Sequence, residues 1–213
     1  MKTTRWISLA LISLSLGACV AAEAMAEGGA ADQFQRSYDS EARGSTAEAL
    51  AALDALPSPQ HDGYVAQLRR GWLLYKLGKH AEAIDCYGKA VAIEPRSVEA
   101  RVGALLPAMA LRRWIDVESG AREVLKMDPG NYLANLRLSF AVYNQGRYGE
   151  AAGLYRRLSE AYPSDVDVRS GLGWALLKAG KQDEAATELR AVLDVAPRNV
   201  LAAEGMKAIG RGG

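Results

Sequence analysis

The strongest constraint on the fold of this 213-residue chain is a spacing of 34 residues that recurs along most of its length. Prolines follow this spacing in one row, Pro95, Pro129, Pro163 and Pro197. Glycines follow it in a second row, Gly44, Gly78, Gly146 and Gly180, and Arg112 fills the remaining place. A third row holds small residues, Ala49, Ala83, Val117, Ala151 and Ala185. Three rows in phase predict a linear array of copies of one structural unit.

The residues between these markers predict that each unit is a pair of helices. From Tyr64 onward, each period contains an amphipathic stretch, a glycine, a second amphipathic stretch and a proline. Glycine tolerates the left-handed conformation that ends a helix, and proline cannot continue a helix interior. Alanine, the best helix former, supplies 38 of the residues. We therefore expect an all-α fold.

The period and its markers resemble those of the tetratricopeptide repeat (TPR) family. The best match is the segment Tyr64–Ser97, which contains the sequence LGKHAEAIDCYGKAVAIEP. The matching residues are Gly71, Gly78, Ala83, Tyr87, Ala90 and Pro95. The resemblance implies an α-solenoid of about five helix–turn–helix units. We expect a degenerate unit at 30–63, full units at 64–97, 98–131, 132–165 and 166–199, and a short capping helix with a tail at 200–213.

Two residues depart from the repeat within the unit 98–131. Pro107 falls in the middle of its first helix, where it removes a hydrogen bond and is expected to kink the helix. Arg112 stands where the neighbouring units have glycine. We expect the solenoid to bend or loosen at this unit.

The first residues predict an export signal. Lys2 and Arg5 precede an uncharged, mostly apolar run that is too short to be a permanent membrane span. Two cleavage sites are compatible with it. A lipobox at Leu16–Cys19 would give a signal peptide of 1–18, a lipid on Cys19, a linker at 19–29 and an outer-membrane lipoprotein facing the periplasm. Cleavage after Ala26 would instead remove 1–26 and release a soluble periplasmic protein.

Composition and motifs exclude several functions. A net charge of +1, with 24% charged residues and no basic cluster, is not typical of a nucleic-acid binder. The sequence has no catalytic triad, phosphate-binding or metal-binding motif, so we expect neither an enzyme nor a cofactor or metal. The two histidines, His61 and His80, fall at turns between helices. Cys86 is expected to be a small buried residue.

The only candidate site is the concave groove of the solenoid. In the family, positions 2, 5, 9, 12 and 13 of each unit usually face this groove. Positions 9 and 12 share one helical face because they are three residues apart. The candidate groove residues on them are Tyr38, Trp72, Tyr75, Leu106, Met109, Phe140, Tyr143, Trp174 and Leu177. At position 5, Phe34, Leu68 and Leu136 are expected to belong to the core.

Polar side chains border this stripe, namely Arg69, Lys76, Arg137, Asn144 and Lys178. Two interpretations stay open for them: they pair with acidic groups of a partner, or they form the solvated edge of the groove. The whole pattern predicts a non-catalytic adaptor or assembly factor of the bacterial cell envelope, which binds an apolar peptide or helix of a client protein. The alternative is a structural scaffold that self-assembles end to end or as a dimer, because a short cap leaves an apolar end face exposed.

Overall fold

A computed structural model describes residues 29–210 of the chain. The expected export signal, with Cys19, and the last three residues of the tail lie outside this range. Within it, the chain is helical and contains no strand. The helices divide into two compact units, one ending at Pro95 and the other beginning at Arg96, and each is described by itself.

The first unit contains a helical segment at 29–42, the helix α2 (Thr46–Asp54), a 3-10 turn η1 (Gln60–Asp62), α3 (Tyr64–Lys76) and α4 (His80–Ile93). The helix α2 has nine residues, whereas α4, its counterpart in the next repeat, has fourteen. Pro57 and Pro59 come shortly after the end of α2, and neither can continue a helix, so the shortening has a local cause.

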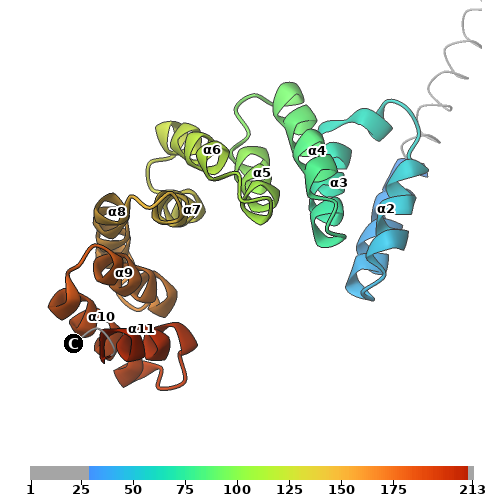
Figure 1. The fold of residues 1–213 in the computed structure, drawn as a ribbon. Helices are drawn as coiled ribbons and strands as arrows, with labels where there is room; N and C mark the ends of the chain where they lie inside the picture. Colours follow the sequence, from blue (N-terminus) through green and yellow to red (C-terminus); the bar gives the residue numbers. More distant parts are fainter. Residues whose placement is uncertain (1–28, 211–213) are drawn as a thin grey trace, which may run out of the picture. The chain divides into compact units, whose positions relative to one another are not determined.

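The second unit consists of α5 (Val98–Ala110), α6 (Trp114–Met127), α7 (Tyr132–Asn144), α8 (Tyr148–Ala161), α9 (Val166–Lys178), α10 (Gln182–Val195) and α11 (Val200–Gly210). Each helix packs against the one before it, and α5, α7, α9 and α11 also lie next to one another in that order (Figure 1). The predicted all-α TPR solenoid with a short C-terminal capping helix is confirmed.

The left-handed turn that ends the first helix of each repeat recurs as the glycine row predicts. Gly44, Gly78, Gly146 and Gly180 have φ between 75° and 82°. Arg112 adopts the same region, with φ of 54°. Its turn keeps the same hydrogen bonds, from the amide of Arg112 to the carbonyl of Met109 and from Arg113 to Ala108, each 2.9 Å.

The unit 98–131 is therefore not loosened at its turn, contrary to expectation. The backbone tolerates one non-glycine residue at positive φ because the surrounding hydrogen bonds determine the turn. The helix α5 also continues without a break past Pro107, whose side chain is fully buried.

The row of small residues is buried between helices. Ala49, Ala83, Val117, Ala151 and Ala185 are all 0% exposed. Two glycines allow a still closer approach to tyrosine rings. A Cβ at Gly71 would lie 2.9 Å from the ring of Tyr87, and one at Gly171 would lie 2.6 Å from that of Tyr155. Both tyrosines are buried, so the glycines create space that the core fills.

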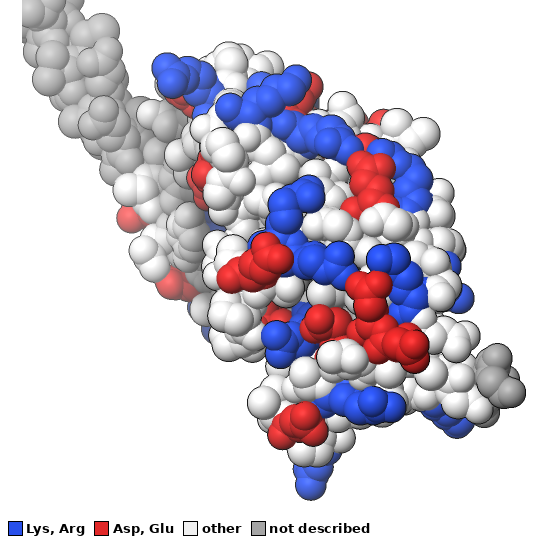
Figure 2. Space-filling model, turned by 90° about the vertical axis from the view of Figure 1, so that its left-hand side faces the viewer, with Lys and Arg blue, Asp and Glu red and all other residues white. Residues whose placement is uncertain are grey.

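Ion pairs join successive repeats on the side of the second helices. Arg122 in α6 contacts Glu150 in α8 at 3.1 Å, and Arg156 in α8 contacts Glu184 in α10 at 2.7 Å. Both arginines and both glutamates are 34 residues apart, so the second pair is the first one repeated one period later. We call this repeated contact the charge seam. Side chains of opposite sign lie intermixed on the face shown in Figure 2.

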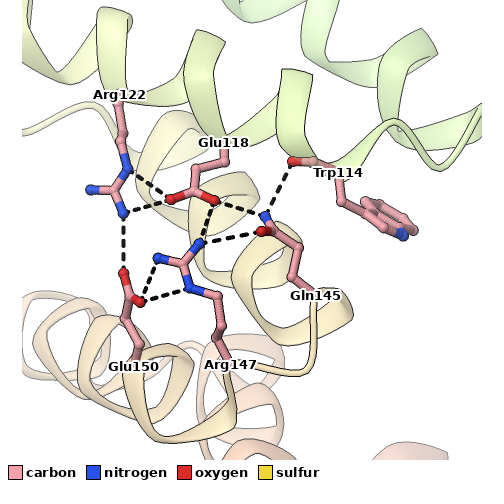
Figure 3. A network of polar contacts seen from close by, with 6 residues as sticks. All are labelled: Trp114, Glu118, Arg122, Gln145, Arg147 and Glu150. Atoms are coloured by element: carbon pink, nitrogen blue, oxygen red, sulfur yellow. Dashed lines mark hydrogen bonds and ion pairs between the residues drawn. The ribbon is translucent and has the colours of Figure 1, made fainter.

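A network of polar contacts next to the seam surrounds Glu118 (Figure 3). This carboxylate accepts hydrogen bonds from Arg122, Gln145 and Arg147 at distances between 2.6 and 3.0 Å. Burial alone would raise its pKa, but these three donors outweigh that effect and lower the pKa to about 2. Arg147 also contacts Glu150 at 2.6 Å. The network holds α6 against the turn between α7 and α8.

Candidate partner-binding groove

The groove face of each first helix follows from helical spacing. On α9, Asp167, Gly171, Trp174 and Lys178 are separated by four, three and four residues, so they lie on one face. The corresponding residues of α7 are Leu133, Arg137, Phe140 and Asn144. Because α7 and α9 pack side by side, their two faces form adjacent parts of one surface.

This surface contains an apolar pocket of about 590 Å³ within the second unit. Its lining residues are Leu106, Met109, Leu133, Leu136, Arg137, Phe140, Tyr143, Tyr155, Asp167, Gly171, Trp174 and Leu201. The volume lies within the range of about 300–1,000 Å³ that is usual for ligand sites. Leu133, Phe140 and Leu201 are 43%, 38% and 50% exposed, so large apolar side chains at the pocket are open to solvent.

Five of the predicted groove residues line this pocket, namely Leu106, Met109, Phe140, Tyr143 and Trp174. Leu177 does not line it, and it packs against the core of the unit. Leu136, which was expected in the core, packs against that core and also lines the pocket.

The other three predicted groove residues, Tyr38, Trp72 and Tyr75, belong to the first unit and form no part of the pocket. Trp72 donates a hydrogen bond from Nε1 to Glu41 at 2.6 Å, and its ring lies 5.9 Å from that of Tyr75. The guanidinium of Arg69 lies 3.6 Å above the centre of the Tyr38 ring. These aromatic side chains are thus engaged with neighbours inside their own unit.

Two of the polar residues that were expected to border the groove are bound to Glu41. Arg69 contacts Glu41 at 3.0 Å and Lys76 contacts it at 3.1 Å. Burial alone would raise the pKa of Glu41, but hydrogen bonds from Trp72 and Lys76 and the charge of Arg69 lower it. Arg69 is only 6% exposed. It is therefore neither a solvated edge residue nor available to a partner, and the expectation for it was wrong.

The same correction applies to Arg137. It is 8% exposed and donates a hydrogen bond from Nη1 to the carbonyl of Val102, so it joins α7 to α5 while lining the pocket. Asn144 is exposed and donates to the carbonyl of Phe140 at 2.8 Å. Lys178 is exposed at the end of α9, as expected of an edge residue.

Several lining residues were not predicted. Leu133, Asp167 and Leu201 occupy position 2 of their repeats, a groove position that could have been extended along the chain in the same way as positions 9 and 12. Tyr155 belongs to a second helix, α8, and it reaches the pocket because Gly171 has no side chain. Burial raises the pKa of Tyr155 well above its usual value, so its hydroxyl stays neutral.

Two further contacts shape the pocket. Trp174 donates a hydrogen bond from Nε1 to the carbonyl of Leu201 at 2.9 Å, which ties the capping helix α11 to α9. Trp114, the first residue of α6, contacts Phe140 edge to face at 5.7 Å. Both contacts fix the orientation of an aromatic ring that helps form the apolar surface.

Other kinds of site find no support in the part of the chain that is described. Between residues 29 and 210, no three His, Cys, Asp or Glu side chains lie together in a way that would hold a metal ion. None of the helices in that range is both long and apolar enough to cross a membrane.

Comparison with known proteins agrees with this geometry. Residues 64–97 and 142–209 each match a family described as "Tetratricopeptide repeat". The chain contains TPR units. Its fold is also that of solved TPR proteins. The MamA protein of Desulfovibrio magneticus RS-1 superposes with a TM-score of 0.75, at 16% identity, over 81% of this chain and 97% of that one. YrrB, described as "a TPR protein with an unusual peptide-binding site", gives 0.71, also at 16% identity, over 84% and 92%.

Two proteins of related sequence match part of the chain. The "Small glutamine-rich tetratricopeptide repeat-containing protein 2" of Mycosarcoma maydis is 29% identical over 93 residues, or 44% of this chain. The "Protein CTR9 homolog" of Arabidopsis thaliana is 30% identical over 115 residues, or 54% of this chain. The matches cover 26% and 10% of those two proteins, so the chain spans about a quarter of the first and a tenth of the second.

Proposed function

We propose that this TPR protein is a non-catalytic interaction module, and that the pocket of its second unit binds an apolar segment of a partner protein. The observation that carries the proposal is the pocket itself. It brings together side chains from α5, α7, α8, α9 and α11, and ten of its twelve lining residues are uncharged. An apolar surface open to solvent marks a binding site more often than it marks a surface without a role.

The types of residue in the pocket suit protein recognition. Aromatic side chains contribute large contact areas with little loss of conformational freedom, and they dominate many interfaces. Phe140, Tyr143 and Trp174 supply such rings here. Trp114 and Leu201 hold two of the rings in place, so the surface is ordered before a partner arrives. The peptide-binding site named for YrrB supports the same role by analogy of fold.

We also propose that the protein acts in the bacterial cell envelope, because its first residues carry a predicted export signal. Replacement of Cys19 by Ser distinguishes the two forms of export. A lipoprotein loses its membrane association in this variant, whereas a protein cleaved after Ala26 fractionates as before. Retention of the native protein in the cytoplasm would contradict both.

The binding proposal is tested by pull-down from an envelope extract with the mature chain. The variant Leu133→Ala/Phe140→Ala removes two exposed apolar side chains from the pocket and leaves the hydrogen bond of Trp174 intact. The control is Ile115→Ala, which removes an apolar side chain that is 75% exposed on α6 and is not part of the pocket. We expect the double variant to lose partners that the control retains. Equal recovery by both would refute the proposal, provided that circular dichroism shows both to be folded.

Self-association is the second candidate function. Val195 and Val200 are 73% and 66% exposed at the junction of α10 and α11. An apolar junction at the end of a solenoid is suited to contact with another copy. Light scattering over a concentration series separates this function from client binding, because a constant monomer mass excludes it.

A further inference from the structure

The two ends of α9 carry opposite charges on the face that forms the groove. Asp167 lines the pocket at the start of the helix, and Lys178 is the last residue of the helix. Within the described range 29–210, neither side chain has an ion-pair partner. The outward second helices differ, because the charge seam and the Glu118 network pair their arginines with glutamates. Unpaired charges thus flank the apolar surface at both edges.

Helix geometry places these two charges at opposite edges of one surface. Eleven residues separate them, which is just over three turns, so they project in nearly the same direction. The rise per residue separates them by about 16 Å along the helix axis. Gly171 and Trp174 lie between them on the same face and line the pocket. A helix laid across α9 has a diameter of about 10–12 Å with its side chains, so it fits between the two charges.

The neighbouring helices carry other residues at the same two positions. Glu99 of α5 occupies the place that Asp167 has on α9, and Leu133 and Leu201 occupy it on α7 and α11. At the opposite edge, Ala110 and Asn144 stand where α9 has Lys178. One edge therefore alternates acidic and apolar residues, and the other edge has no acidic residue at this position. A ligand that runs along the groove meets unlike charges on its two sides.

We infer that the partner segment is an amphipathic α-helix that lies along the groove, across α5, α7, α9 and α11, with basic residues on one flank and acidic residues on the other. Its apolar face fills the pocket, its basic flank contacts Asp167 and its acidic flank contacts Lys178. This inference rests on the proposed function and adds the chemistry and the direction of the occupant.

The charges determine the direction in which the helix binds. Turning an amphipathic helix end for end, with its apolar face still in the pocket, exchanges its two flanks. The reversed helix places base next to Lys178 and acid next to Asp167, which is repulsive at both edges. Exposed pairs of this kind change affinity modestly, so we expect the correct direction to be favoured by roughly threefold to tenfold.

The test uses a synthetic amphipathic peptide of about five helical turns. Leucines form its apolar face, lysines one flank and glutamates the other, and a nitroxide is attached at its N-terminus. Binding to the full chain is followed by NMR, and the spin label broadens the signals of nearby residues. Met109 of α5 and Leu201 of α11 report the two ends of the pocket. A second peptide, with glutamine on both flanks, is the control.

We expect the charged peptide to bind as a helix and to broaden one of the two reporters more strongly than the other. In Asp167→Lys/Lys178→Asp the other reporter should broaden more strongly, because the charges at the edges are exchanged. In the milder variant Asp167→Asn/Lys178→Gln, and with the glutamine peptide, the difference between the two reporters should shrink. Stronger broadening of the same reporter by the same margin in all three proteins, or an extended bound peptide, overturns the inference and leaves the proposed function intact.

Failure of the proposed function gives a different result. In that case neither peptide perturbs the lining residues, or Leu133→Ala/Phe140→Ala binds both peptides as tightly as the native chain does.

Discussion

The replacement Glu118→Gln isolates the contribution of the Glu118 network to stability. The pKa of Glu118 falls from 4.5 to about 2 in the folded chain. If the full shift were realised, the charged form would be stabilised by about 3.4 kcal/mol, at 1.36 kcal/mol for each pH unit. Arg122 and Arg147 are 46% and 41% exposed, so solvent screens both contacts. We therefore expect the glutamine variant to lose about 1–2 kcal/mol of unfolding free energy at pH 7.

The loss depends on pH in a defined direction. The folded pKa of Glu118 is depressed, so its contribution is fully present above pH 4.5 and is lost as the pH falls toward 2. At pH 3.5, which lies between the pKa of Glu118 in the unfolded chain and its pKa in the folded chain, about three fifths of this stabilisation remains. The stability difference between the native chain and Glu118→Gln should shrink accordingly between pH 7 and pH 3.5.

Urea unfolding, followed by circular dichroism at pH 7 and pH 3.5, measures both effects. The matched control is Glu184→Gln, which removes a carboxylate of the charge seam that is 48% exposed. Its loss should be clearly smaller, because exposed ion pairs contribute little to stability. A loss for Glu118→Gln no larger than that of the control, or one that does not change with pH, would refute the reasoning.

Three further predictions follow from local geometry. Arg112→Gly should stabilise the fold by up to about 1 kcal/mol and so raise the melting temperature, because glycine adopts positive φ without strain. An unchanged or lower melting temperature in a thermal scan would contradict this. Gly71→Ala should cost about 1–3 kcal/mol in urea unfolding, because its Cβ would lie 2.9 Å from the ring of Tyr87; the control Gly88→Ala meets no atom within 4 Å and should not be destabilised. Cys86 should react with a thiol reagent far more slowly in the folded chain than in urea, since burial raises its pKa, and equal rates would show that the thiol is accessible.

The repeat made most of the fold predictable. Helices end where glycine permits a left-handed turn and where proline stops the second helix. As a result, the expected repeats start at the first residues of the helices α3, α5, α7, α9 and α11. The unit 98–131 was expected to bend or loosen, in part because Arg112 stands where the other units have glycine. The backbone hydrogen bonds of the turn were not visible in the sequence, and they hold Arg112 in that conformation.

The candidate site was predictable in part, for reasons that individual residues show. Phe140 and Tyr143 were found because groove residues three apart share a helical face. Arg69 was misplaced because its partner, Glu41, comes from the preceding repeat, so that only the packing of the two helices brings them together. Tyr155 was missed because its access to the pocket depends on a missing side chain at Gly171, a property of two residues on different helices.

The charge seam also makes whole repeats exchangeable. Arg122 contacts Glu150 in the next repeat, and Arg156 contacts Glu184 in the same way. Excision of residues 132–165 would bring Arg122 opposite Glu184, and duplication of that segment would recreate the same pair at each new junction. The chain can therefore grow or shrink by whole periods without a mismatch in these ion pairs, whereas a deletion of any other length breaks them. In this respect the two junctions are equivalent, and the array can change its length by whole repeats without altering the pattern of these ion pairs.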